Sequence, residues 1–427
     1  MGMGFRERGG KEDFIMRIIA VLLITLLLAG CSTRNEAVIQ TSTFVREISI
    51  TFERIIPDPP PLWTRADLEE FERQMEDINR QLRVNGLSLA VFADGEVIYT
   101  YNHGYASRSA DIPACDNTRY RSASVSKTAT AICAMILHDR GLLDLDESVS
   151  KITGLNMDSR SQVAPNTTRH LLSHTSTIVD TSAYHNGWER GPKTAEQILR
   201  NGVFSSGEPG RRYQYSNFAS GMVAAVIESI TEQRFYAFAQ ENLFELLSMD
   251  AAYTRDLIED VDSIANLYRS GRLVHNVQTW GRTTNLYDRI PLGQSWGLSE
   301  CEMIISATDL ARLGIIVSGD GSVDGIQVIT TESVMEMRAP FMGSFENDLN
   351  NHVRGLGLRI FGNAVENRVI TGHAGNALGM VGGLFFDCSD RTGVAILTNG
   401  CSGGVNENGM HRINDEIVKL VYEIFFD

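Results

Sequence analysis

Strand-like patterns occur at both ends of the globular part of the chain, and a long stretch of other sequence separates them. Toward the N-terminus, Asp94-Gly95 joins the apolar runs Leu87–Phe92 and Val97–Tyr101, which is a strong signal for a β-hairpin. Toward the C-terminus four more runs follow: Leu356–Phe361, Arg368–Thr371, Met380–Phe386 and Gly393–Leu397. Residues 144–345 read mostly as helices and loops. These patterns predict an α+β fold (an α/β sandwich) in which an antiparallel sheet from both chain ends is flanked by helices and carries an inserted, mostly helical subdomain.

Apolar residues at helical spacing mark the expected helices. One pattern opens at Thr64 and continues through Leu82. A second, strongly apolar pattern runs from Lys127 to about Leu143 and ends near Gly141, since glycine is favoured just past a helix end. Further helices are predicted over Ala219–Thr231, Phe235–Leu247, Ser306–Ser318 and about Asn414 to Phe425.

The N-terminus has the pattern of a targeting segment. Arg17 precedes a run of 13 mostly apolar residues, Ile18–Gly30, which is shorter than the roughly 20 residues needed to span a bilayer and suits the core of a signal peptide. The run ends in Leu28-Ala29-Gly30-Cys31, which resembles a bacterial lipoprotein cleavage box in which Cys31 takes the lipid. An ordinary signal peptide that contains a cysteine is the alternative, and translation can start at Met1 or Met16.

These features divide the chain into three parts. Residues 1–30 are expected to be a lipoprotein signal peptide, and residues 31–63, rich in proline near their end, a stiff tether. Residues 64–427 are expected to form the folded domain, with the helical insertion over about 144–345. The predicted location is therefore the bacterial cell envelope, with the protein anchored to a membrane by lipid and facing the periplasm or the exterior.

Charge and cysteine content limit the possible chemistry. The formal net charge of −15, without a block rich in Lys or Arg, argues against nucleic-acid binding. Five cysteines remain after Cys31, so at least one is unpaired or bridges to another molecule, and their pairing stays open: Cys115, Cys133, Cys301, Cys388 and Cys401. Cys133 lies in an apolar helix and is expected in the core. No CxxC pair occurs, so neither a metal nor a redox cofactor is predicted.

A serine and a lysine three residues apart suggest a nucleophile and its base. Ser124 and Lys127 open the apolar helix and would lie on one face of it, one turn apart. Burial and neighbouring charge could keep the amine neutral, so that it accepts the serine proton. Ser148 and Lys151 repeat the spacing, but they are followed by Ile-Thr-Gly, which reads as a loop. The first copy is therefore preferred.

A tyrosine and an asparagine two residues apart form the second element. Tyr215 and Asn217 stand between a Pro-Gly turn and an apolar helix, which would present both side chains to a cleft. The phenol could shuttle a proton, and the amide could hold Lys127 or a substrate carbonyl. Tyr184 begins a similar Tyr-x-Asn triplet in a polar loop with no helix expected behind it, so Tyr215 is preferred.

A short motif before the strand at Met380 supplies the third element. Small residues in Gly372-His373-Ala374-Gly375 would let a substrate backbone approach a strand edge. His373 could assist proton transfer, and the N–H groups of Asn376 and Ser124 could form an oxyanion hole. A glycine bulge with a structural histidine is the alternative reading.

Together these motifs resemble the class C β-lactamase-like serine hydrolases, including D-alanyl-D-alanine peptidases and related esterases, from about Leu87 to the C-terminal helix. The order of the motifs agrees, and so do the stretches Tyr120–Ala123, Leu143–Asp146, Arg169–Ser176 and Ile305–Ala311. Members with β-lactamase or transpeptidase activity usually carry Lys-Thr-Gly or Lys-Ser-Gly where this chain has His-Ala-Gly, and usually Gly where it has Thr177.

The resemblance implies residue roles and a function. It implies Ser124 as acyl acceptor, Lys127 as base, Tyr215 as proton shuttle and His373 as the third-motif residue, with Asn217, Gly375 and Asn376 at the substrate. The implied protein is an extracytoplasmic hydrolase of an ester, amide or peptide, with cell-wall material as one source of substrate, and it needs no cofactor or metal. Alternatives are a β-lactamase or D-Ala-D-Ala carboxypeptidase proper, which the missing Lys and hydroxyl of the third motif disfavour, and a non-catalytic, ligand-sensing lipoprotein. The oligomeric state is left open.

Overall fold

The computed structural model describes residues 63–427 apart from 159–161, 188–192, 277–278, 280–282, 342–352, 363 and 407–408. The predicted signal peptide, Cys31 and nearly all of the predicted tether lie outside the described residues. Within the described part, no helix combines the length and apolarity that crossing a membrane requires.

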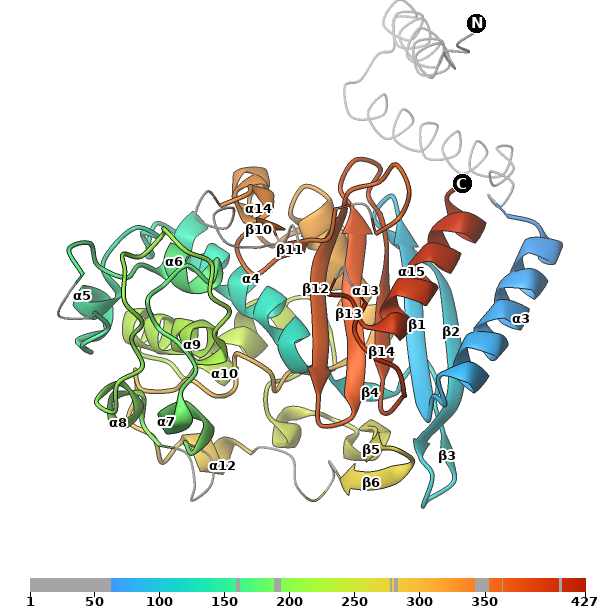
Figure 1. Ribbon diagram of the computed structural model, residues 1–427, viewed down its shortest axis with the longest axis horizontal. Coiled ribbons are helices and arrows are strands. Elements are labelled where there is room, and N and C mark those ends of the chain that lie inside the picture. Colours follow the sequence, from blue (N-terminus) through green and yellow to red (C-terminus); the bar gives the residue numbers. More distant parts are fainter. Residues whose placement is uncertain are drawn as a thin grey trace, which may run out of the picture. The chain divides into compact units, whose positions relative to one another are not determined.

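An eight-stranded sheet joins the two ends of the chain, as predicted (Figure 1). Its order is β10-β11-β12-β13-β14-β1-β2-β3, and neighbouring strands are antiparallel. The ends meet where β1 pairs with β14, for example at Leu89 opposite Ile396. The strands are β1 Gly86–Ala93, β2 Glu96–Ser107, β3 Ile112–Pro113, β10 Val353–Arg354, β11 Arg359–Ile360, β12 Ile370–Ala377, β13 Met380–Asp387 and β14 Thr392–Thr398.

Two strand predictions in the C-terminal part were wrong in extent. The predicted strand Leu356–Phe361 is reduced to β11, because Gly357 takes a left-handed conformation (φ +66°) and its N–H donates to the Leu172 carbonyl instead of a strand. The third motif was placed between strands, but it lies inside β12, where His373 is opposite Leu384 of β13. The strand expected over Arg368–Thr371 begins only at Ile370.

Helices cover both faces of the sheet (Figure 1). On one face lie α3 Arg65–Gln81 and α15 Arg412–Phe425, and on the other α13 Ala307–Ser318. The Thr64 hydroxyl accepts from the Asp67 N–H, and the Asp67 carboxylate accepts from the Thr64 N–H, so α3 begins where predicted. Phe71 of α3 packs edge-on against Tyr99 of β2 and Phe425 of α15, with ring centroids 5.5 and 5.1 Å away.

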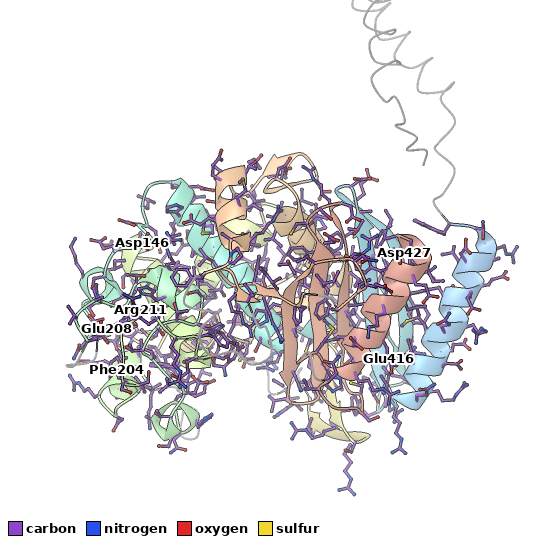
Figure 2. The ribbon with its side chains drawn as sticks, turned by 45° about the horizontal axis from the view of Figure 1, so that its top comes forward. Asp146, Phe204, Glu208, Arg211, Glu416 and Asp427 are labelled. Carbon is purple, nitrogen blue, oxygen red and sulfur yellow. The ribbon has the colours of Figure 1, made fainter. Side chains whose placement is uncertain are left out.

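The inserted region is mostly helical, with short strand pairs. Its helices are α4 Ser126–Asp139, α5 Val149–Thr153, α6 Thr168–Leu172, α7 Ser182–His185, α8 Ala195–Leu199, α9 Asn217–Thr231, α10 Phe235–Ala239, α12 Thr284–Tyr287 and α14 Thr331–Arg338. Its strands are β4 Arg119–Arg121 with β7 Ile304–Ser306, β5 Leu267–Arg269 with β6 Arg272–His275, and β8 Ser322–Val323 with β9 Ile326–Gln327. Figure 2 shows Asp146, Phe204, Glu208 and Arg211 in this region, and Glu416 and Asp427 in the part of the molecule near α15.

Several helix boundaries differ from the predictions. The predicted helix Phe235–Leu247 is α10 followed by a π-helical turn over Gln240–Phe244, in which the Glu245 N–H bonds to the Gln240 carbonyl five residues back. The helix predicted from Lys127 to near Gly141 is α4, which begins one residue earlier and ends at Asp139, two residues before the left-handed Gly141 (φ +69°). The two sequences read as loops, around Lys151 and around Tyr184, form the short helices α5 and α7.

Strand β12 lies against the turn that carries Ser124, and Gly375 is the residue of closest approach. A Cβ atom added at Gly375 would lie 2.6 Å from the Ser122 carbonyl oxygen and 3.2 Å from Cγ2 of Val125. The first contact is with backbone, which cannot rotate away. The small residue expected at the strand edge is thus required by the packing of the protein itself.

We expect Gly375→Ala to lower the free energy of unfolding by about 1 to 3 kcal/mol, because the new methyl group overpacks this contact. Urea unfolding measures the change. Gly404→Ala is the matched control, since no heavy atom lies within 4 Å of a Cβ there. Equal stability of the two variants would contradict the close approach.

Candidate active site

Ser124 lies in a 3-10 turn, Ala123–Val125, that leads directly into α4. The turn is entered through Ala123, whose φ of +49° is in the left-handed region that non-glycine residues rarely adopt. Hydrogen bonds hold it in place: the Val125 N–H donates to the Ser122 carbonyl, and the Ser126 hydroxyl donates to the Ala123 carbonyl at 2.6 Å. Ser124 is thereby fixed, half-buried, at the N-terminal end of a buried helix.

Lys127 is buried, 3% exposed, and its amine contacts three oxygen atoms. Its Nζ lies 3.3 Å from Ser124 Oγ, 2.9 Å from Asn217 Oδ1 and 2.8 Å from the Glu300 carbonyl oxygen. Burial by itself lowers the pKa of Lys127, as expected, but the oxygens of Tyr215 and Glu300 nearby favour the charged form, and the pKa is raised. The surroundings of Lys127 therefore favour the charged form of its amine, whereas the sequence analysis expected them to favour the neutral form.

Tyr215 contacts both Ser124 and Lys127. Its hydroxyl donates to Ser124 Oγ at 3.1 Å, and its ring lies 5.3 Å from Lys127 Nζ. The ring of His174 packs on Tyr215 with centroids 4.2 Å apart, and His174 Nδ1 accepts from the Ser216 N–H. Burial and then the charges of Arg354 and Lys127 hold the pKa of His174 well below its usual range, so this histidine is neutral.

Asp180 positions the second motif and was missed in the sequence. Its carboxylate accepts from the Ser216 hydroxyl at 2.8 Å, and from the backbone N–H of Asn217 and of Phe218 at 3.0 and 2.9 Å. It also accepts from Asn217 Nδ2 at 2.9 Å. A carboxylate at the N-terminus of α9 is favoured by the unpaired N–H groups and the helix dipole. Because Asp180 lies 36 residues before Ser216, no local pattern pointed to it.

His373 is buried on β12, but it does not hydrogen-bond to Ser124, Lys127 or Tyr215 in the described structure. Its Nδ1 lies 2.8 Å from the Ala374 carbonyl oxygen, which requires the N–H at Nδ1. Burial, followed by the charges of Lys127 and Arg354, holds the pKa of His373 well below its usual range. The third motif therefore presents a neutral ring.

The remaining residues of the predicted oxyanion and substrate site follow on the same strand. Gly375 lies against the Ser124 turn, as described above, and Asn376 is the next residue of β12 with its side chain exposed. The strand thus brings the Asn376 backbone into the neighbourhood of the nucleophile. An oxyanion hole from this N–H and that of Ser124 stays a prediction.

The two alternative motifs of the sequence do not join the cluster. Ser148 caps α5, and its hydroxyl accepts from the Lys151 N–H. The Lys151 side chain is 76% exposed and pairs with Glu147. Tyr184 instead donates its hydroxyl to the Glu300 carboxyl group, at 3.1 Å from each oxygen.

A buried segment with two acidic residues, Glu300 and Glu302, contacts Lys127. The Glu300 side chain is 1% exposed, and burial raises its pKa to about 8 against the opposing charge of Lys127. Next to it, Glu302 pairs with Arg121 through two contacts of 3.0 and 3.1 Å.

The predicted core residue Cys133 is buried, and all five cysteines are unpaired. Among the described residues, no three His, Cys, Asp or Glu side chains are grouped so as to hold a metal ion.

The chain is similar over part of its length to a penicillin-binding protein. The penicillin-binding protein 4* of Bacillus subtilis is 26% identical over 176 residues, which are 40% of this chain and 38% of that protein. The chain therefore spans well under half the length of this relative.

Two solved structures are similar over more of the chain. A β-lactamase/D-alanine carboxypeptidase from Pseudomonas syringae is 19% identical with a TM-score of 0.63, over 84% of this chain and 98% of that one. The octameric penicillin-binding protein homologue from Pyrococcus abyssi is 23% identical with the same TM-score, over 78% and 74%. At these identities the likeness shows a shared fold.

The model of one protein family, described as Beta-lactamase, matches residues 70–418. This range contains Ser124, Lys127, Tyr215 and His373 with the sheet and helices that place them. The chain belongs to the β-lactamase family.

Proposed function

We propose that the protein is an extracytoplasmic serine hydrolase that forms an acyl-enzyme at Ser124 with an ester, amide or peptide substrate. The observation that carries the proposal is that Ser124 Oγ lies within hydrogen-bond distance of both Lys127 Nζ and Tyr215 Oη. A hydroxyl between an amine and a phenol can pass its proton to one of them as its oxygen attacks a carbonyl, and that group can then give the proton to the leaving group. Export and a lipid on Cys31 are supported by the N-terminal sequence alone.

The resting ammonium defines what Lys127 can do. Before Lys127 can act as the base it must release its proton. Because its pKa is raised, only a small fraction of the amine is neutral at a given pH, and that fraction falls as the pH falls. While charged, it stabilises negative charge that develops on Ser124 or Tyr215, because it lies beside both. The activity should therefore rise with pH, and Tyr215 takes a direct part in moving the serine proton.

Substrate preference follows from the third motif. His373 is neutral, and Ala374 has no hydroxyl, so this edge lacks the charged donor and hydroxyl that bind a substrate carboxylate strongly. This favours an ester or an uncharged amide group next to the cleaved bond over penicillin or a D-Ala-D-Ala terminus. A β-lactamase or D-Ala-D-Ala carboxypeptidase proper is the second candidate, favoured by the shared fold of the Pseudomonas syringae enzyme.

Ser124→Ala should abolish labelling by a fluorophosphonate probe and lower the hydrolysis of p-nitrophenyl esters by about a thousandfold or more, because no acyl acceptor remains. Gel fluorescence and initial rates measure both effects, with nitrocefin and D-Ala-D-Ala peptides as competing substrate classes. Ser148→Ala, at the other Ser-x-x-Lys copy, is the control and should keep full activity. A wild-type protein that neither labels nor turns over would identify a non-catalytic ligand-sensing protein.

Tyr215→Phe should lower kcat for ester hydrolysis by about 100-fold or more, because it removes the hydroxyl bonded to Ser124 while keeping the ring that packs on His174. Steady-state kinetics across pH measure the loss. Tyr184→Phe is the matched control, since that hydroxyl bonds to Glu300 and not to Ser124. Equal losses in the two variants would refute the assigned role of Tyr215.

Glu300 should make the protein less stable as pH rises. Its folded pKa of about 8 exceeds the ordinary value of 4.5, so between these values the unfolded chain has lost a proton that the folded chain keeps. In Glu300→Gln this titration is absent. The stability of the variant relative to wild type should therefore increase from pH 5 to 8, by at most about 1.4 kcal/mol per pH unit.

Chemical unfolding at several pH values measures the stability of Glu300→Gln minus that of wild type. His174 and His373 titrate in both proteins, so their contributions, which have the opposite sign, cancel in this difference. Glu69→Gln, at a side chain that is 65% exposed, is the control. A flat difference for Glu300→Gln would mean that this carboxyl is already ionised in the folded protein.

A further inference from the structure

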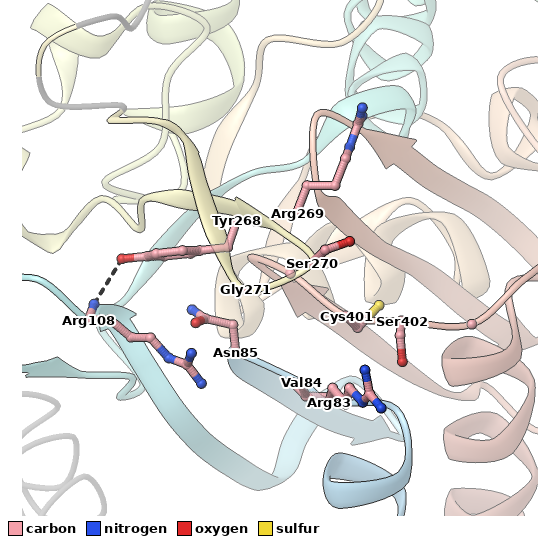
Figure 3. A pocket seen from close by; sticks show the side chains of 12 residues that line it. Arg83, Val84, Asn85, Arg108, Tyr268, Arg269, Ser270, Gly271, Cys401 and Ser402 are labelled. Carbon is pink, nitrogen blue, oxygen red and sulfur yellow. Dashed lines mark hydrogen bonds between the residues drawn. The ribbon is translucent and has the colours of Figure 1, made fainter.

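A cavity apart from the hydrolytic site opens at the end of the sheet where the chain leaves β14 and where β1 begins (Figure 3). Its volume is about 600 Å³, and none of the residues assigned to the hydrolytic site lines it. Three segments far apart in sequence form its walls, namely the loop between α3 and β1, the end of β2 and the β5–β6 hairpin, and a fourth segment, the loop after β14, also lines it. The cavity therefore has no part in the proposed reaction at Ser124.

The walls of the cavity are held together by polar contacts that do not involve its charged residues. Asn85 Nδ2 donates to Asn399 Oδ1 at 3.0 Å, and Asn399 Nδ2 donates to the carbonyls of Tyr105 and Ala106. The Tyr268 N–H donates to the Asn399 carbonyl at 2.7 Å. Asn85 and Asn399 are 4% and 0% exposed, so this is a buried, fixed connection between the segments.

Each wall carries one arginine: Arg83 follows α3, Arg108 follows β2, and Arg269 stands at the turn of the β5–β6 hairpin. Arg108 is tied to the hairpin, because its backbone N–H donates to the Tyr268 hydroxyl at 2.9 Å (Figure 3). All three arginines are exposed, so the cavity is open to solvent. The cluster is thus assembled by the fold and not by a run of basic sequence.

The charge of this cavity is opposite to that of the protein. No Asp or Glu lines it, although the whole chain has 53 acidic and 38 basic residues. Within the described part of the chain, none of the three guanidinium groups forms an ion pair with a carboxylate, whereas Arg65, Arg73 and Arg200 on exposed helix surfaces each do. A bound anion would pair with guanidinium groups that have no carboxylate partner in the described part of the chain.

We propose that this cavity binds the phosphate group of a ligand, at a site separate from the hydrolytic one. The planar fork of a guanidinium group matches phosphate oxygens with paired hydrogen bonds, and three such groups suit a dianion better than a single carboxylate. The hydroxyl groups of Ser270 and Ser402 line the same cavity and can donate to further oxygens. A free phosphorylated compound and a lipid headgroup both carry this chemistry.

Titration calorimetry of the full chain with glycerol phosphate and with inorganic phosphate tests the proposal at two salt concentrations. Wild type should bind, more weakly at the higher salt, and the triple variant Arg83→Gln, Arg108→Gln, Arg269→Gln should bind about tenfold or more weakly. The matched control carries the same change at three exposed arginines elsewhere, Arg65, Arg73 and Arg200, and should bind within about twofold of wild type. No binding by wild type, or equal weakening in both triple variants, would overturn the proposal.

Two further measurements complete the test. Flotation with vesicles of phosphatidylglycerol, compared with vesicles of phosphatidylcholine alone, separates a lipid headgroup from a soluble phosphate compound. Capture by the vesicles that the first triple variant loses and the control keeps identifies a lipid headgroup. Calorimetric binding without capture identifies a soluble phosphate compound. Arg269→Gln alone, at an exposed hairpin turn, guards against misfolding of the triple variant and should weaken binding about threefold. Ester hydrolysis at Ser124 should be unchanged in every variant, so loss of the site is distinguishable from loss of the enzyme.

Discussion

The buried ammonium group of Lys127 is the interaction on which the candidate site depends. A charge that is 3% exposed needs oxygen atoms from the protein in place of water, and each of the three that it contacts belongs to a different segment. Ser124 comes from the turn before α4, Asn217 from the start of α9, and the Glu300 carbonyl from the chain before β7. Three separate segments are therefore joined at one point by a charge that no segment could satisfy alone.

The orientation of Asn217 follows from a second charge. Its Nδ2 donates to Asp180, so its Oδ1 must face Lys127, and the amide assignment is fixed by its two neighbours. Asp180 and Lys127 thereby interact through a neutral amide and do not neutralise each other by direct contact. Tyr215 is held in the same way, by the Ser216 contacts with Asp180 on one side and by the ring of His174 on the other. Lys127, Asn217 and Tyr215 are thus positioned near Ser124 before any substrate arrives.

Periodicity and short spacings predicted the parts of the molecule that depend on neighbours in sequence. The β1–β2 hairpin at Asp94-Gly95, the start of α3 at Thr64 and the pairing of Ser124 with Lys127 are such cases. Assembling the sheet from both chain ends also followed, because strands of matching pattern had no other partners. Tyr215 was expected to lie at Ser124 because the order of the motifs resembles that of the family.

Other features depend on contacts between distant residues, and no local pattern encodes them. Asp180 acts on residues 36 to 38 positions later, and Glu300 contacts Lys127 across 173 positions. The direction of the pKa shift of Lys127 could not be predicted for the same reason: burial can be inferred from an apolar helix, but the groups that raise the pKa, Tyr215 and Glu300, lie before α9 and before β7. The extent of β11 likewise depends on Gly357, whose N–H bonds to Leu172 far back in the chain.

The buried Lys127 and the three exposed arginines of the cavity lie in contrasting surroundings. At the hydrolytic site the cation is enclosed and its hydrogen bonds are satisfied by protein oxygens, while the neighbouring histidines are kept neutral by burial and by that same cation. A site of this kind stabilises charge that develops during a reaction, because its dipoles are already oriented and water is excluded. At the second cavity the arginines are exposed and have no carboxylate partner within the described chain, so their charge is free to attract a charged group from solution. The first arrangement suits chemistry on an uncharged carbonyl, and the second suits the binding of an anion that is not transformed.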